Sequence, residues 1–157
     1  MNRHQQLDCH TPRGRQYIER QMDVAHRVAE RYGHDVIFTP DGDARFDCLF
    51  HKDSVLMGIA EIKVREMHRR DLERFGTYLV TEDKLLAGIE VASSCRVPFA
   101  LIIALHDCDL FLKISDHQGN RVASWKADTT KTQATCNGGV ANRNNAYINL
   151  KTAVWLV

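Results

Sequence analysis

The chain has 157 residues, of which 44% are hydrophobic and 26% charged, and its formal net charge is +1. This length is enough for one domain with a buried core, and the near-neutral charge does not by itself indicate a nucleic-acid partner. No apolar run approaches the roughly 20 residues of a membrane span, and residues 1–11 lack the apolar segment of a signal peptide. We therefore predict a protein without a membrane partner.

The five cysteines are odd in number and scattered, at positions 9, 48, 95, 108 and 136. They form no CxxC pair, and no Cys/His cluster has the spacing of a zinc finger. Cysteines in this arrangement are typical of reduced thiols, so we expect a cytoplasmic protein.

The first half of the chain predicts a helix followed by three strands. Thr11 is a suitable N-cap and Pro12 suits the first turn, while Gly33 ends the apolar helical pattern. Between them, the helix carries an apolar stripe at helical spacing: Ile18, Met22, Ala25, Ala29 and Tyr32. The predicted strands cover residues 36–38, 45–51 and 54–65.

The second half predicts a charged loop, a second helix and further strands. The loop covers residues 66–76, the helix 81–95, and the strands 99–105, 110–114 and 147–157. Residues 121–125 follow a turn. Residues 126–146 are polar without periodicity, which predicts a long loop that is either functional or mobile.

This order predicts an α/β domain with a mixed β-sheet flanked by helices. The tight connection at residues 52–53 indicates an antiparallel hairpin between the second and third strands. The long helix before residue 99 indicates a crossover to a parallel neighbour.

Charged residues interrupt two of the apolar strands. Asp47 lies on the second strand, and Glu61 and Lys63 lie two apart on the third, so they share a face, with Ile62 opposite. Burying unpaired charges is costly, and a divalent metal would explain them. We predict that Asp47, Glu61 and the Ile62 carbonyl bind a hard cation, and that Lys63 holds the attacking water or offsets charge on a phosphate.

An alternative is that Glu61 and Lys63 form an ordinary ion pair at an exposed strand edge. An acid-x-lysine triplet is a weak signal, because the chain contains a second one, Glu82-Asp83-Lys84, on the predicted second helix. The apolar strand around Glu61 and the aspartate on the preceding strand favour the metal site.

With these residues in place, the chain resembles the PD-(D/E)xK nuclease superfamily, which has the restriction-endonuclease-like fold. That core has the order αβββαβ, with the aspartate on the second strand and E-x-K on the third. The resemblance covers residues 13–114, within a core of about 12–114, and leaves 115–157 as a C-terminal β extension of the same domain. Phe46 replaces the proline of the motif.

The pattern is closest to archaeal-type Holliday-junction resolvases and to small phage or homing endonucleases. The resemblance implies a Mg²⁺-dependent DNA endonuclease in which Mn²⁺ can substitute, with Asp47, Glu61 and Lys63 as catalytic residues. It further implies that Glu19 on the first helix completes the metal site and that Lys84 on the second helix faces it. The alternative function is a non-catalytic module of the same fold that binds nucleic acid or protein.

DNA contacts are expected from arginine, which outnumbers lysine fourteen to seven and binds phosphate through a planar fork. The predicted contacts are Arg13, Arg15, Arg65, Arg69 and Arg70. A solvated face neutralised by Glu66, Asp71 and Glu73 is the alternative. We expect duplex or branched DNA as partner, a homodimer because one site cuts one strand, and no small-molecule cofactor.

Overall fold

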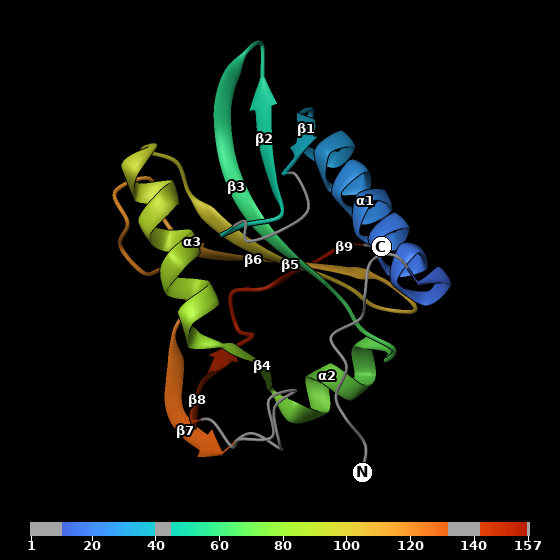
Figure 1. Ribbon diagram of the computed structural model, residues 1–157, viewed down its shortest axis with the longest axis vertical. Helices are drawn as coiled ribbons and strands as arrows, with labels where there is room; N and C mark the ends of the chain where they lie inside the picture. The colour runs from blue at the N-terminus through green and yellow to red at the C-terminus, as the bar shows by residue number, and fades with distance from the viewer. Residues whose placement is uncertain (1–10, 40–44, 132–141, 157) are drawn as a thin grey trace.

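The computed structural model describes residues 11–39, 45–131 and 142–156, and there the chain forms three helices and nine strands (Figure 1). The helices are α1 (Pro12–Tyr32), α2 (Arg69–Phe75) and α3 (Glu82–Ser94). The strands are β1 (Asp35–Phe38), β2 (Cys48–Lys52), β3 (Val55–Val64), β4 (Thr77–Thr81), β5 (Phe99–Ala104), β6 (Asp109–Ser115), β7 (Trp125–Lys131), β8 (Asn142–Asn149) and β9 (Val154–Leu156).

The strands form two sheets. A six-stranded sheet has the order β1-β2-β3-β5-β6-β9, and a three-stranded sheet has the order β4-β8-β7. In the larger sheet β3 and β5 pair in parallel, while the other neighbours pair antiparallel. This confirms the predicted hairpin between β2 and β3, the crossover through α3, and the αβββαβ order, with α2 and β4 inserted between β3 and α3.

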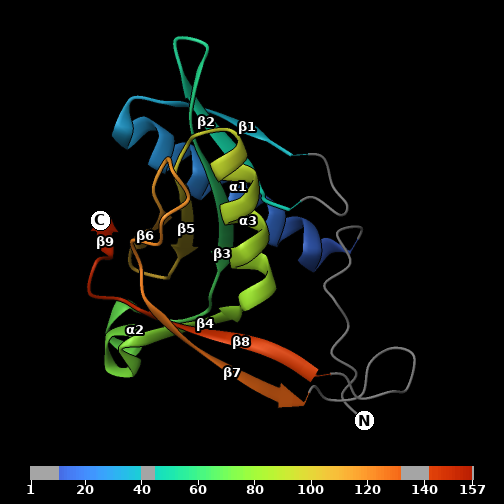
Figure 2. The same ribbon diagram turned by 90° about the vertical axis from the view of Figure 1, so that its left-hand side faces the viewer.

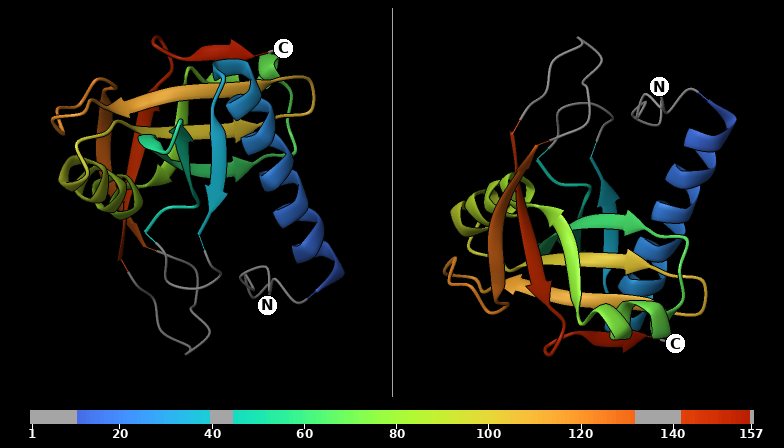
Figure 3. Two further views of the ribbon diagram at one scale, coloured as in Figure 1. Left: turned by 90° about the horizontal axis from the view of Figure 1, so that it is seen from above. Right: turned by 90° about the horizontal axis from the view of Figure 1, so that it is seen from below.

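The six-stranded sheet separates two hydrophobic cores. On one face Ala60, Ile62 and Val64 of β3 pack with the buried side of α1. On the other face Ile59 packs with α3 and with β4 and β8 of the smaller sheet. Figure 1 shows α1 to the right of the central strands and α3 to the left. Figure 2 shows the smaller sheet below the central strands, and Figure 3 shows it on the side of α3. Alternate residues of β3 therefore belong to different layers.

Helix α1 begins and ends where the sequence predicts. The Thr11 hydroxyl accepts a hydrogen bond from the Gly14 N–H at 3.0 Å, and Gly33 ends the helix with φ of 68°. The predicted stripe is only partly right: the buried side chains are Val24, Ala25, Val28 and Ala29, whereas Met22 and Tyr32 are exposed. No helix in the described part of the chain is both long and apolar enough to cross a bilayer.

Two predicted loops are wrong in the structure. Residues 66–76 contain α2, where the His68 N–H donates to the Asp71 carboxylate at the start and Gly76, with φ of 70°, ends the helix. Residues 126–146 contain most of β7 and the start of β8, while residues 132–141 lie outside the described part. Residues 147–157 are not one strand, because β8 ends at Asn149 and β9 follows a turn.

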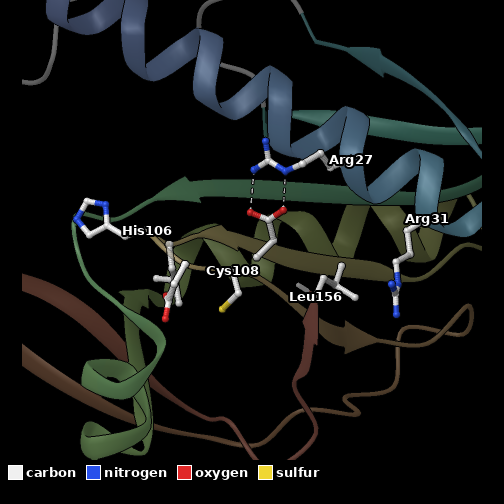
Figure 4. A pocket seen from close by; sticks show the side chains of 8 residues that line it. Arg27, Arg31, His106, Cys108 and Leu156 are labelled. Carbon is white, nitrogen blue, oxygen red and sulfur yellow. Dashed lines mark hydrogen bonds and ion pairs between the residues drawn. The ribbon is translucent and has the colours of Figure 1, made fainter.

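Arg27 joins α1 to β6 at the rim of a hollow of about 400 Å³ (Figure 4). Its guanidinium donates two hydrogen bonds to the Asp109 carboxylate, at 2.8 and 2.9 Å. The Asp109 side chain is 11% exposed, and its hydrogen bond raises the pKa of Arg27. This pair compensates a nearly buried carboxylate, so it serves the packing of α1 on the sheet.

We predict that Arg27→Ala lowers the free energy of unfolding by about 1–3 kcal/mol, because it leaves the Asp109 carboxylate buried without its two donors. Urea unfolding at neutral pH measures the loss. The control is Arg31→Ala, since Arg31 is exposed on the same helix and its loss should cost less than about 0.5 kcal/mol. Equal stability of the two variants would contradict the assignment.

Candidate active site

The site begins where β2 separates from β3. The antiparallel pairing of β2 with β3 ends at Cys48 and Ala60. Asp47, the residue before β2, still donates its N–H to the Ala60 carbonyl at 3.0 Å. The Asp47 carboxylate then accepts the next free donor of β3, the Ile62 N–H, at 2.7 Å. The side chain of Asp47 thus continues the hydrogen bonding that the strand no longer supplies, and this fixes the carboxylate against β3.

Thr39, just after β1, holds the backbone of Asp47 from the other side. Its N–H donates to the Asp47 carbonyl at 3.0 Å, and its hydroxyl contacts the carbonyls of Phe46 and Asp47 at 2.8 and 3.0 Å. Sequence reasoning missed Thr39, because a threonine that follows a strand carries no signal of a long-range contact.

Glu61 and Lys63 lie on one face of β3, as the strand period predicts. The Lys63 ammonium contacts the Glu61 carboxylate at 2.6 Å, and the side chains are 24% and 4% exposed. Ile62 is buried in the opposite core. The alternative of an exposed edge pair does not hold, because β3 lies between β2 and β5 and Glu61 is buried.

Burial and a neighbouring carboxylate both disfavour the ionised form of Asp47. Burial and the nearby charge of Glu61 raise the pKa of Asp47 to about 6, against the lowering effects of the Ile62 N–H and Lys63. Burial, with the charges of Asp47 and Glu61, also raises the pKa of Cys48 to about 12. Cys48 is therefore an inert buried thiol rather than a nucleophile.

Helix α3 brings Lys84 to the same group. Lys84 is exposed in the first turn of the helix, and its charge lowers the pKa of Asp47. The structure thus brings together Asp47, Glu61, Lys63 and Lys84, four of the residues that the sequence selects.

Helix α1 contributes Gln21 rather than Glu19. The Gln21 amide donates to the Ile62 carbonyl at 3.3 Å. Residues two apart on a helix lie roughly 200° apart around its axis, so Glu19 faces elsewhere, and it is exposed. The structure does not bring Glu19 to the carboxylates. A helical-wheel comparison with the buried Gly14 and Ala25 would have selected Gln21.

The oxygen atoms at the site are of the kind that bind a hard cation. Two carboxylates, of Asp47 and Glu61, and the Ile62 carbonyl meet beside β3, while among the described residues no three His, Cys, Asp or Glu side chains cluster. Mg²⁺ is commonly held by one or two carboxylates, with water and phosphate oxygens as further ligands. The residues present therefore fit Mg²⁺ or Mn²⁺, and a cation would offset the burial and the repulsion that disfavour the ionised form of Asp47.

A hollow of about 340 Å³ opens beside Lys63, between the start of α1 and the end of β3. It is lined by Gly14, Tyr17, Ile18 and Gln21 of α1 and by Lys63, Val64 and Arg65. The guanidinium groups of Arg13 and Arg20 lie 6.0 and 5.7 Å from the centre of the Tyr17 ring at its rim. Cationic and aromatic groups thus surround an opening next to the candidate catalytic lysine.

The predicted DNA-binding arginines fall into two groups. Arg13, Arg15 and Arg70 are exposed. Arg65 and Arg69 make internal contacts: Arg65 lies over the Tyr78 ring at 5.5 Å, and Arg69 lies over the Trp155 ring at 4.5 Å and donates to Glu73 at 2.9 Å. The charged segment that sequence reasoning assigned to DNA is therefore partly used to attach α2.

The geometry agrees with a comparison of the sequence with known families. The family described as "Phage putative PDDEXK endonuclease" matches residues 16–135, which contain Asp47, Glu61, Lys63 and Lys84. The chain belongs to this family. Among solved structures it is similar to Hjc, a Holliday junction resolvase from Archaeoglobus fulgidus, with 13% identity and a TM-score of 0.47 over 60% of this chain and 75% of that one. No curated protein matches.

We predict that Asp47→Asn stabilises the metal-free protein. The pKa of Asp47 is about 6 in the folded protein, against an ordinary value of 3.8. Between pH 3.8 and pH 6 the folded state therefore binds more protons at Asp47 than the unfolded state does. The contribution of Asp47 to stability therefore falls as pH rises from about 4 to 6. The asparagine oxygen can still accept the Ile62 N–H. The variant should gain about 1–2 kcal/mol above pH 6, and this gain should vanish towards pH 4.

Urea unfolding in EDTA at pH 4.5 and pH 7.5 measures the difference. Exposed Asp128→Asn is the control and should change stability by less than about 0.5 kcal/mol at either pH. If Asp47→Asn is less stable than wild type at pH 7.5, the ionised Asp47 carboxylate does not destabilise the folded protein and the prediction is wrong.

Proposed function

We propose that this PDDEXK family member is a metal-dependent DNA endonuclease that hydrolyses phosphodiester bonds at the site formed by Asp47, Glu61 and Lys63. The observation that carries the proposal is the placement of two carboxylates and a lysine around the segment of β3 that β2 leaves unpaired. Charges with no metal or substrate to bind would be costly to keep there.

In this proposal Asp47, Glu61 and the Ile62 carbonyl hold Mg²⁺, or Mn²⁺ in its place. A bound ion would polarise the scissile phosphate and lower the pKa of a water molecule. Asp47 is oriented for this by the Ile62 N–H and by Thr39. The Gln21 amide, which donates to the Ile62 carbonyl, would set the orientation of that carbonyl.

Lys63 and Lys84 supply positive charge from β3 and α3. The Lys63 ammonium is partly exposed beside the hollow, so it can reach a phosphate or hold the attacking water while it stays next to Glu61. Lys84 is exposed across from Asp47, and its flexible side chain can offset charge that develops on the phosphate.

The DNA backbone would pass the hollow beside Lys63. Exposed Arg13 and Arg15 at the start of α1 would contact flanking phosphates, which position the duplex without reading its sequence. Duplex and branched DNA both present such phosphates. We expect a homodimer where both strands are cut, and light scattering of the purified protein tests this expectation.

We predict metal-dependent cleavage that Lys63→Ala reduces at least about 100-fold, because the lysine acts on the reacting phosphate or water. The substrates are supercoiled plasmid and a four-way junction, each with Mg²⁺, Mn²⁺ or EDTA. Lys52→Ala is the matched control, since Lys52 is exposed on the β2–β3 hairpin and should cut as wild type does.

The alternative is a module that binds nucleic acid without cutting it. Wild type that binds DNA but cuts neither substrate with either metal would favour that module and refute the nuclease. Cleavage that persists in EDTA would refute the metal site. Equal loss of activity in Lys63→Ala and Lys52→Ala would refute the role of Lys63.

A further inference from the structure

Strands β7 and β8 extend beyond the strand that supports them. They pair from Trp125–Ile148 to Lys131–Asn142, whereas β4 covers β8 only from Asn149 to Asn145. Residues 129–131 and 142–144 therefore form a two-stranded ribbon without a third strand, here called the distal ribbon. At about 3.4 Å per residue it extends about 10 Å past the end of β4.

The distal ribbon leaves the body at the end that carries the candidate site. Strand β4 ends at Thr81, opposite Asn145, and the chain passes directly into α3, whose first turn carries Lys84. Figures 2 and 3 show the ribbon and the N-terminal half of α1 extending to the same side of the molecule. A nucleic acid bound at Lys63 would thus meet α1 and the distal ribbon together.

The distal ribbon has an inner face, which continues the buried side of β8, and an outer face on the opposite side. Ala146 and Ile148 of β8 are fully buried against α3 and β5, and Asn144 and Asn142 continue that inner face by strand alternation. Thr129 and Lys131 lie opposite them, and the Thr129 hydroxyl and Asn144 side chain contact at 3.0 Å. The outer face carries Thr130 and Arg143, in line with Lys126.

The chemistry of the distal ribbon suits a DNA groove. All six residues are exposed and none is acidic or large and apolar, so the surface offers little to a hydrophobic partner. A two-stranded ribbon fits the major groove of B-DNA, which is about 12 Å wide. Asparagine can bind adenine with two hydrogen bonds, and lysine can bind the guanine acceptors.

We propose that the distal ribbon enters the major groove of duplex DNA beside the scissile phosphate and reads base edges through Lys131, Asn142 and Asn144. This inference rests on the proposed function and assigns to it a preference for duplex over single-stranded DNA and a sequence-reading element. Arg143, on the outer face, would contact the backbone.

The test compares inner-face with outer-face variants in two assays. Duplex binding is measured by fluorescence anisotropy in EDTA, and sequence preference by sequencing the products cut from a random-sequence duplex library. Lys131→Ala and Asn144→Ala should weaken binding about tenfold or more and relax the preference at one or two positions. Lys126→Ala removes the same charge as Lys131→Ala from the outer face of the same strand, and should weaken binding less than about threefold.

Equal effects of Lys131→Ala and Lys126→Ala, with an unchanged cut-site preference in Asn144→Ala, would overturn the inference. If the wild type still cuts DNA in that case, the proposed nuclease stands without the ribbon. Wild type that binds single-stranded and duplex DNA equally would also overturn the inference about the distal ribbon. Wild type that neither binds nor cuts DNA would overturn both. Unchanged melting temperatures of the variants exclude misfolding, since every substituted side chain is exposed.

Discussion

The candidate site depends on one hydrogen bond, from the Ile62 N–H to the Asp47 carboxylate. A sheet leaves no donor unpaired at low cost, so the end of β2 obliges a side chain to complete the edge of β3. The Asp47 carboxylate accepts this donor. Glu61 precedes Ile62 on β3, and its side chain lies on the opposite face of the sheet from that of Ile62. The requirement of the backbone thus brings a second carboxylate next to Glu61, and burial together with the nearby charge of Glu61 raises the pKa of Asp47.

The alternation of β3 gives the site its support. Ile62 and Val64 anchor the strand on α1, while Glu61 and Lys63 turn towards the side of α3 and β4. Both layers therefore reach the candidate site: α1 through Gln21 at the Ile62 carbonyl, and α3 through Lys84 near Asp47. The carboxylates of Asp47 and Glu61 therefore have Lys63 beside them on β3 and Lys84 on a separate helix.

The sequence predicts the parts of the molecule that local pattern decides. Apolar runs and caps locate α1, α3 and β3, and the strand period places Glu61 and Lys63 on one face. The polar composition of residues 66–76 and 126–146 predicts loops, because it hides the capping of α2 and the pairing of β7 with β8. Long-range contacts such as Thr39 with Asp47 have no local signal. The resemblance selects Glu19, whereas the buried face of the helix selects Gln21.

The distribution of arginines shows why composition alone misjudges a nucleic-acid surface. Arg20 pairs with Glu66 and Arg27 with Asp109, so two of the cations on α1 join the helix to the rest of the fold. Arg69 is likewise engaged with Glu73 and Trp155. Exposed cations remain at the start of α1 and on β7 and β8. A chain with a net charge of +1 can thus present positive charge locally, because some of its carboxylates pair with cations that join its helices to the fold.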